Sequence, residues 1–264
     1  MALTDILVTI DHHTSSAARL AVAVGLAKGH QARLTGLLVI RHDYPVEAAV
    51  AAAREMFEQQ VAGAGIEGRW RCVDGSGVDA RMTEIILYHA QFTDLLIVGQ
   101  GSPESASVGV PSDLPECVVL GAGRPVLVVP YAGTFASVGE RVLVVWKAGR
   151  ESTRALSDAL PFLKQAQRVD IWAKNRSETY VEDDETVCAD ICAHLARHGV
   201  TAKADNLRAG NTPLGDVLLN RVCDEGFDLL VMGAYAHGNE GDMALGSVAR
   251  QLLREMTVPI LMSN

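Results

Sequence analysis

Two short stretches, Asp94-Leu-Leu-Ile-Val-Gly99 and Asp228-Leu-Leu-Val-Met-Gly233, decide how this chain folds. Each places four apolar residues between an acidic residue and a glycine, a pattern typical of a short strand buried on both faces of a parallel sheet. The offset of 134 positions between them also carries Arg124-Pro-Val-Leu-Val-Val129 onto Val258-Pro-Ile-Leu-Met-Ser263 without a gap. A repeat of this length indicates a duplicated domain and not the short unit of a solenoid.

The beginning of each copy is located in the same way. Ile6-Leu-Val-Thr-Ile10 matches Val142-Leu-Val-Val-Trp146 at an offset of 136 positions. Between the copies, Tyr131–Gly139 has no hydrophobic period and contains glycine, serine and threonine, which is typical of a linker. We therefore expect two domains, residues 1–133 and residues 140–264.

Within each copy, strand-length and helix-length patterns alternate. Short β-branched runs are expected to form strands buried on both faces, as in a parallel sheet. They are Ile6–Ile10, Arg33–Ile40, Arg69–Val73, Leu95–Val98 and Val126–Val129, then Arg141–Trp146, Val169–Ala173, Thr201–Asn206, Leu229–Met232 and Pro259–Met262. The segments expected to form helices, with apolar residues three and four apart, are Ser16–Lys28, Val46–Ala62, Asp79–Gln91 and Ser112–Leu120, then Ser152–Gln165, Asp183–His198, Pro213–Glu225 and Ser247–Glu255. This alternation requires right-handed crossovers and predicts two tandem, doubly wound, flavodoxin-like α/β domains, each with a five-stranded parallel sheet.

Two helix limits carry specific local signals. Gly29 follows the first helical segment and is expected to end it, because glycine adopts the left-handed conformation without strain. Thr212 precedes Pro213, which predicts a hydroxyl cap followed by proline at the first helical position.

Composition and charge exclude several classes of protein. The chain of 264 residues has a formal net charge of −9, with −5 before residue 134 and −4 after it, so a nucleic-acid partner is not expected. No apolar run approaches the roughly 20 residues that span a bilayer, and the N-terminus lacks a basic stretch before its apolar residues. We expect a cytoplasmic protein without membrane association. The five cysteines form no CxxC pair, which favours reduced, partly buried thiols over a metal site.

A second motif follows the fourth strand of the second copy, where a doubly wound sheet places its ligand. It reads Gly233, two residues, Ala236-His237, eight further residues, then Gly246-Ser247-Val248. This resembles the Gly-x2-Gly-x9-Gly-Ser/Thr motif of nucleotide-binding members of the universal stress protein family, with one glycine replaced by alanine. The resemblance covers both halves of the chain.

The resemblance implies a stress-response regulatory or binding protein, not an enzyme, with ATP or another phosphate ligand as the candidate cofactor in the second copy. The residues it assigns to that site are Gly233, Ala236, His237, Gly246, Ser247 and Val248 in the motif, with Trp146 and Lys147 after the first strand. A helix N-terminus carries about half a positive charge and attracts phosphate, so such a motif is chemically suited to the ligand. The alternative is that Gly233 only ends a strand and Ser247 only caps a helix.

Besides Ala236, three residues depart from the family pattern. Lys147 stands where nucleotide-binding copies have an aspartate that contacts the nucleoside, and lysine cannot accept a hydrogen bond. Two alternatives remain for Lys147: it neutralises an anion, together with Arg208 or Arg250, or it is simply solvated. Glu240 and Asp242 add two negative charges to the loop, so a triphosphate there would need a cation.

The first copy has the opposite pattern. Asp11 stands at the aspartate position, but the loop reads Gly99-Gln-Gly-Ser102 and ends at Ser112-Asp113, so the final hydroxyl has become a carboxylate. A triphosphate site is therefore not expected in this copy. His12 and His13 beside Asp11 are compatible with acid–base chemistry or a metal, but neighbouring strand-end residues point apart, which favours solvated loop histidines.

Hydrolase and kinase motifs are absent from the sequence, since GxSxG, HExxH and GxxxxGK[ST] do not occur. Three hypotheses remain: a regulatory protein with a ligand in the second copy, a degenerate protein-interaction scaffold, and, more weakly, an ATPase. The resemblance also implies an internal pseudo-dimer in which Val126–Val129 and Ile260–Met262 pair, an unidentified protein partner, and further homodimerisation as an open alternative.

Overall fold

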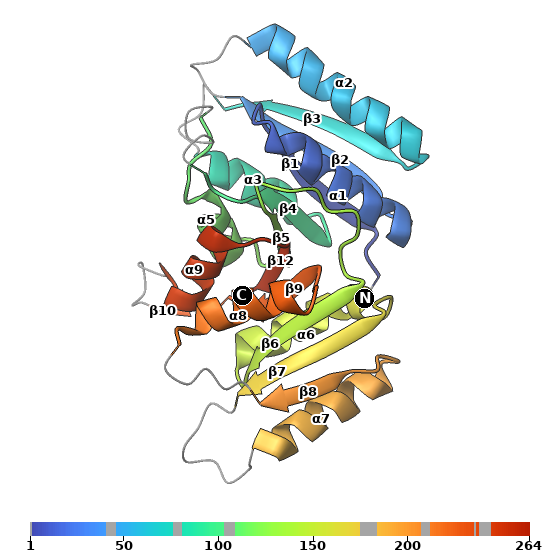
Figure 1. Ribbon diagram of the computed structural model, residues 1–264. Helices are drawn as coiled ribbons and strands as arrows, with labels where there is room; N and C mark the ends of the chain where they lie inside the picture. Colours follow the sequence, from blue (N-terminus) through green and yellow to red (C-terminus); the bar gives the residue numbers. More distant parts are fainter. Residues whose placement is uncertain are drawn as a thin grey trace. The chain divides into compact units, whose positions relative to one another are not determined.

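The computed structural model describes residues 2–40, 46–75, 81–102, 109–174, 184–206, 212–234, 236–237 and 244–264. The chain divides into two compact units, Ala2–Ala136 and Ser137–Asn264, which we call the first and the second domain. Figure 1 follows the first domain from blue to green and the second from yellow-green to red.

The first domain is a parallel sheet with helices on both faces. Its strand order is β3-β2-β1-β4-β5. The strands are β1 Asp5–Ile10, β2 Arg33–Ile40, β3 Gly68–Asp74, β4 Leu95–Gly99 and β5 Val126–Val129, and the helices are α1 Ser15–His30, α2 Val46–Ala64, α3 Met82–Ala90 and α5 Leu114–Gly121. Helix α1 packs on α2, and α3 packs on α5. Because right-handed crossovers reverse direction after β3, these two pairs cover opposite faces.

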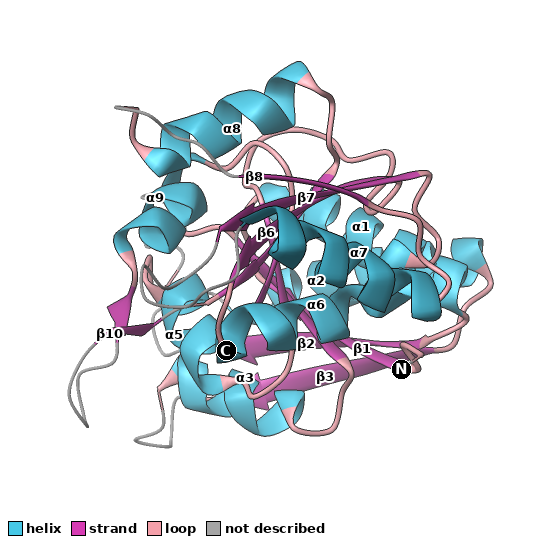
Figure 2. Cartoon of the chain, turned by 90° about the horizontal axis from the view of Figure 1, so that it is seen from below, coloured by secondary structure: helices cyan, strands magenta, loops and turns pink. Residues whose placement is uncertain are grey.

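The second domain repeats this arrangement with the order β12-β9-β6-β7-β8. Its strands are β6 Arg141–Lys147, β7 Arg168–Lys174, β8 Lys203–Asn206, β9 Leu229–Gly233 and β12 Ile260–Ser263, and its helices are α6 Arg150–Leu163, α7 Asp184–Arg197, α8 Leu214–Asp224 and α9 Ser247–Glu255. The two strand orders are the same permutation, so the doubly wound fold predicted from the repeat is confirmed. Figure 2 shows strands of both domains with helices packed beside them.

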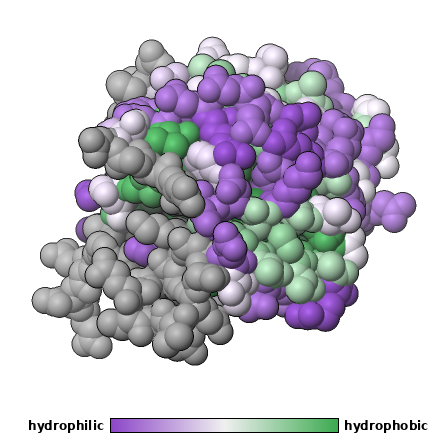
Figure 3. Space-filling view, turned by 60° about the horizontal axis from the view of Figure 1, so that its bottom comes forward, coloured by the Kyte–Doolittle hydropathy of each residue, from purple (hydrophilic) through white to green (hydrophobic). Residues whose placement is uncertain are grey.

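The apolar runs of the sequence form the buried strands of each domain. Every residue of β5 and the first four residues of β4 and β9 are buried. Strands β3 and β8, each at one end of its domain's strand order, differ from the expectation, because they contain only exposed and half-buried residues. An edge strand lacks a neighbour on one side and is only partly covered by helices, so its residues need not be apolar. Hydrophilic residues prevail among those coloured on the face drawn in Figure 3, around a smaller hydrophobic area.

In each domain, the acidic residue that opens the repeated stretch lies just before one strand and accepts hydrogen bonds from main-chain groups at the start of a neighbouring strand. Asp94 Oδ2 accepts hydrogen bonds from the main-chain N–H groups of Thr4 and Asp5 and from the Thr4 hydroxyl. Asp228 accepts bonds from three consecutive main-chain N–H groups, which belong to residues 139, 140 and 141, and from the Ser137 hydroxyl. Each carboxylate therefore accepts hydrogen bonds from main-chain N–H groups at the start of a central strand, β1 or β6, and so gives these donors the partner that they need.

Several local expectations are wrong. Helix α1 continues past Gly29 to His30, and Gln31 takes the left-handed conformation at φ 55° with its N–H on the Ala27 and Lys28 carbonyls. Helix α8 begins at Leu214, so Pro213 is the cap and Thr212 lies outside. All five cysteines are free, as expected, but Cys72, Cys117 and Cys223 are exposed because they lie on an edge strand and on outer helix faces.

Candidate functional site

The predicted site lies at the carboxyl edge of the second-domain sheet. Strands β6 and β9 are neighbours, with Val145 paired to Met232. The next residues along them are Trp146 and Gly233, followed on β6 by Lys147. The register therefore brings these three candidate residues, which are far apart in sequence, to one end of two adjacent strands.

Gly233 is required by the packing of helix α6. A Cβ atom at this position would lie 2.6 Å from the carbonyl carbon of Glu151 and 2.6 Å from the main-chain nitrogen of Ser152. These are backbone atoms in the first turn of α6, so they cannot swing aside as a flexible side chain would. The space beside Gly233 thus belongs to α6, and close approach of helix to strand is the physical reason for this glycine.

The segment after β9 turns back on itself as a two-stranded ribbon. Strand β10, Ala236–His237, pairs antiparallel with β11, Ala244–Leu245. Ala236 is therefore in extended backbone, which alanine adopts as readily as the glycine it replaces. Sequence inspection missed the ribbon because each strand is only two residues long. The loop carboxylates Glu240 and Asp242, and Arg208, lie outside the described residues.

The ribbon leads directly into helix α9. Gly246 occupies the cap position with extended backbone (φ −58°, ψ 155°) and, having no side chain, makes no side-chain capping bond. Ser247 is the first helical residue and is exposed, so Gly246 and not Ser247 holds the cap position. The first turn contains no acidic residue. Val248 is half-buried, and Arg250 is exposed one turn into the helix.

In both domains, a buried serine accepts a hydrogen bond from the residue at the carboxyl end of the first strand. The main-chain N–H of Lys147 donates to Ser152 Oγ over 3.2 Å, and the N–H of Asp11 donates to Ser16 Oγ over the same distance. The two serines are 136 positions apart, the offset that relates β1 to β6. Sequence reasoning missed them because a serine at a helix start suggests only a cap, although the repeat offset would have matched them.

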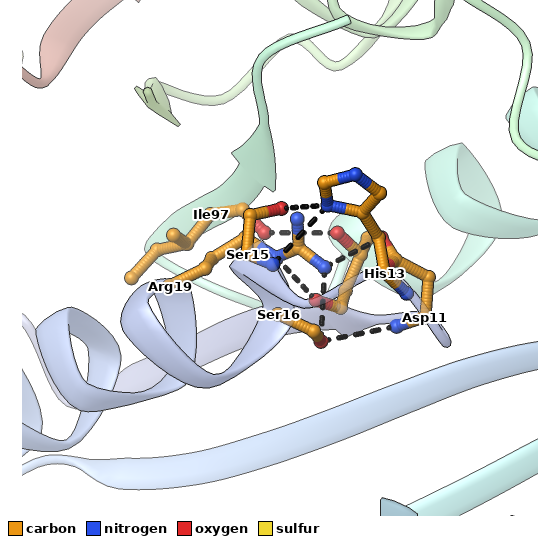
Figure 4. A network of polar contacts seen from close by, with 7 residues as sticks. Asp11, His13, Ser15, Ser16, Arg19 and Ile97 are labelled. Carbon is orange, nitrogen blue, oxygen red and sulfur yellow. Dashed lines mark hydrogen bonds and ion pairs between the residues drawn. The ribbon is translucent and has the colours of Figure 1, made fainter. Parts of the chain in front are cut away.

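In the first domain, Asp11 is neutralised by an arginine of the same domain (Figure 4). Arg19 Nη2 lies 2.6 Å from Asp11 Oδ2, and the Arg19 side chain is 3% exposed. Arg19 also donates from Nε to the Thr9 carbonyl and from Nη2 to Ser16 Oγ. A Cβ on Gly99 would lie 2.0 Å from Arg19 Nη1, so this glycine makes room for the guanidinium. Sequence reasoning did not identify Arg19 as the partner of Asp11.

The histidines beside Asp11 are half-buried and not freely solvated. The main-chain N–H of His13 donates to Asp11 Oδ1 over 2.9 Å, and His13 Nδ1 accepts from the Ser15 N–H. The turn that Asp11 makes with His13 draws the imidazole back against the start of α1, which explains the difference from expectation. In the part of the chain that the structure describes, no three histidine, cysteine or acidic residues gather as a metal site.

The helix that corresponds to α9 in the first domain has the opposite charge character at its start. Asp113 holds the cap position of α5 without a side-chain capping bond, and Glu116 adds a second carboxylate in the first turn. Pro115 removes one of the first-turn N–H donors. A pocket of about 30 Å³ beside Asp11 is bounded by the ends of β1 and β2, by α3 and by Leu114. Typical small-molecule sites occupy about 300–1,000 Å³, so this pocket is far smaller.

A model of the universal stress protein family matches residues 140–264. A comparison with curated protein sequences gives no match. None of the described helices is long and apolar enough to cross a membrane.

Solved structures resemble the chain over both domains. A universal stress protein from Archaeoglobus fulgidus DSM 4304 is similar with a TM-score of 0.71 and 16% identity, covering 98% of this chain and 96% of that one. A protein of unknown function from Pseudomonas aeruginosa PAO1 gives 0.62 and 15%, covering 99% and 92%. The cytoplasmic domain of a prokaryotic cation chloride cotransporter gives 0.54 and 9%, covering 99% and 95%. Such identities show the fold alone. Residues 140–264 thus belong to the universal stress protein family, and the whole chain has the fold of a universal stress protein with two consecutive domains.

Proposed function

We propose that this protein is a stress-response regulatory protein whose second domain binds a phosphate-bearing ligand at the start of α9, whereas its first domain does not. The observation that carries the proposal is the difference between the two corresponding helix starts. Helix α9 begins with Gly246 and an exposed Ser247 and has no acidic residue in its first turn. Helix α5 begins with Asp113 and has Glu116 in the same turn.

The electrostatics of the two starts differ in sign. The orphan N–H groups of a helix start carry about half a positive charge in total. In α9 that charge is unopposed within the first turn, and the exposed Arg250 adds to it. In α5 two carboxylates outweigh it, so an anion approaching α5 would be repelled.

The first-strand residues support the same division. Lys147 ends β6 at the carboxyl edge of the second-domain sheet and brings a positive charge to the side where a phosphate would bind. Asp11 in the first domain already holds Arg19, so its carboxylate is not available to a ribose hydroxyl. Because lysine donates and cannot accept hydrogen bonds, we expect recognition through phosphate groups with little selectivity for the base.

Calorimetric titration of the full chain with ATP, GTP and pyrophosphate, each with and without magnesium, tests this proposal. Ser247→Asp reproduces the residue of the first domain at the same repeat position, and we expect it to abolish binding. Asp113→Ser is the matched control in the first domain, and we expect it to leave the affinity of the second site unchanged.

Two outcomes would contradict the proposal. If the wild-type protein gives no binding heat with any of the three ligands, the alternative of a protein-interaction scaffold is favoured. If Asp113→Ser changes affinity and Ser247→Asp does not, the ligand lies in the first domain and the assignment of the domains is wrong.

A further inference from the structure

Two large aromatic side chains are exposed side by side at the end of helix α3. Tyr88 is 59% exposed and Phe92 is 67% exposed. Their ring centroids lie 5.8 Å apart at an interplanar angle of 75°, and Tyr88 makes a similar edge contact with His89. Exposed aromatic residues in contact with one another form an apolar patch, and such patches commonly mark interaction sites.

The second domain shows that the fold does not need these aromatics. Each of the corresponding helices buries two apolar residues four positions apart: Ile86 and Ala90 in α3, Leu218 and Val222 in α8. Aligned on these pairs, Tyr88 corresponds to Asn220 and Phe92 to Asp224, and both of these polar residues are exposed. The same helix face is thus ordinary solvated surface in one domain and aromatic in the other.

Edge strand β3 adds positive charge beside the aromatic pair. Trp70 packs on Phe57 of α2, with ring centroids 5.6 Å apart, so its face of the strand is the α2 side. Because side chains alternate along a strand, Arg69 and Arg71 project to the opposite face, which is that of α3. The two arginines are partly or fully exposed, since β3 forms the sheet edge.

The packing of Gly75 places this flank of α3 next to β3, and the electrostatics of His89 agree with it. A Cβ on Gly75, the residue after β3, would lie 3.1 Å from Cδ1 of Ile85 in α3. Burial lowers the pKa of His89, and the positive charges of Arg71 and Arg69 lower it further. Arg69, Arg71, Tyr88, His89 and Phe92 therefore share one surface, which we call the aromatic–basic surface.

This surface contrasts with the charge of the protein. The chain carries a net charge of −9. Glu84, the acidic residue of α3, lies in the first turn of the helix, away from Phe92, and its carboxylate accepts a bond from the Arg81 N–H. A region with two arginines and two exposed aromatics is thus a local exception on an acidic molecule, and it complements a ligand that is both acidic and apolar.

We propose that the aromatic–basic surface of the first domain binds an acidic peptide segment of a partner protein. Carboxylates of the segment pair with Arg69 and Arg71, and an apolar side chain packs against Tyr88 and Phe92. Arginine and aromatic residues are the side chains enriched at energetically important interface positions. A nucleic acid is disfavoured, because two arginines neutralise few phosphates and the remainder of the chain repels a polyanion.

Fluorescence anisotropy with two labelled dodecapeptides tests the proposal. One consists of Glu-Glu-Leu repeats and the other of Lys-Lys-Leu repeats. We expect the full-length protein to bind the glutamate peptide with a Kd of about 10–100 µM, the range of a weak transient contact, and to bind more weakly as salt is added. We expect no binding of the lysine peptide.

Variants taken from the second domain separate the surface from the fold. Tyr88→Asn and Phe92→Asp introduce the residues of α8, and together we expect them to weaken glutamate-peptide binding about tenfold. Arg69→Glu with Arg71→Glu should abolish it. Lys203→Glu, on the exposed edge strand β8, is the matched charge reversal and should change affinity less than twofold. Circular dichroism establishes that each variant is folded.

Several results would overturn the proposal. These are equal binding of both peptides, wild-type affinity in the arginine or aromatic variants, and displacement of the peptide by a 12-nucleotide oligouridylate of higher affinity. Sedimentation velocity supplies the remaining test. If the wild-type protein self-associates and Tyr88→Asn with Phe92→Asp makes it monomeric, the occupant is a second copy of this chain and the proposed partner is wrong.

Discussion

Arg19 Nη2 lies 2.6 Å from the carboxylate of Asp11. At the corresponding positions of the repeat, the second domain has Lys147 in place of Asp11 and Ala155 in place of Arg19. The first domain thus supplies an internal cation to the residue that the family resemblance assigns to a nucleoside. The second domain has neither member of the pair. This exchange accounts for the different chemistry that we propose for two sites built on one fold.

Replacing Arg19 with alanine, the second-domain residue, should destabilise the first domain by about 3 kcal/mol, because the mutation leaves Asp11 without its buried partner. Urea unfolding monitored by circular dichroism measures the loss. Adding Asp11→Asn to Arg19→Ala should recover part of it, since the remaining group is then uncharged. A loss below about 1 kcal/mol for Arg19→Ala would show that the pair is not important for stability.

Gly233→Ala should destabilise the second domain by about 2 kcal/mol, because the added methyl group meets the backbone of Glu151 and Ser152. Gly29→Ala is the matched control, since this helical glycine has open space around its missing Cβ and alanine favours the helix by up to about 1 kcal/mol. Thermal unfolding of both variants gives the comparison. Equal effects of the two substitutions would contradict the packing argument.

Asp94 should make the stability of the first domain depend on pH. Burial alone would raise the pKa of this carboxyl, but hydrogen bonds from the Thr4 hydroxyl and from the Thr4 and Asp5 amides, with Arg124, lower it below its ordinary value. A carboxyl with a lowered folded-state pKa stabilises the protein above its unfolded-state pKa, and this contribution is lost as the pH falls through the folded-state pKa.

Urea unfolding from pH 7 to pH 3 tests that dependence. Asp94→Asn should be less stable at pH 7 and should lose less stability on acidification than the wild type. Glu58→Gln, in the exposed pair with Arg54, is the control and should follow the wild-type profile. Parallel profiles for Asp94→Asn and the wild type would show that the carboxylate is not the source of the slope.

Lys147→Asp restores the residue that the family resemblance implies, while it removes a positive charge from the proposed phosphate site. We expect a higher preference for ATP over GTP and little change in total affinity, because the new acceptor and the lost charge act in opposite directions. Calorimetry with both nucleotides in magnesium measures this preference. An unchanged ratio of the two affinities would mean that residue 147 does not face the base.

The fold could be predicted because its information is local and repeated. Buried strands such as Leu95–Gly99 are continuous apolar runs that no other element type explains as well, and their recurrence at a fixed offset reveals the duplication. Helix limits were less accurate, as Gln31 shows, because tertiary context decides which residue takes the left-handed conformation. Edge strands were misjudged for burial, since sequence order alone does not show which strands lie outermost.

The sequence predicts the position of a candidate site residue only where that residue directly follows a recognisable strand. Asp11 and Lys147 stand directly after recognisable strands, and the structure places both at strand ends. Arg19 was missed because it lies eight residues further along, on a helix where an arginine suggests a solvated side chain. Only the three-dimensional approach of α1 to β1 and β4 shows that its guanidinium is buried beside Gly99.

Tandem linkage has a consequence for how these sites can change. In a dimer of identical chains, every substitution appears twice, so both sites must tolerate it together. Here Asp94 and Asp228 accept equivalent main-chain hydrogen bonds in the two domains, whereas Asp11 and Lys147, at corresponding positions, have charges of opposite sign. The two domains of one chain can therefore keep the same scaffold while the residues at the ends of β1 and β6 change independently of each other.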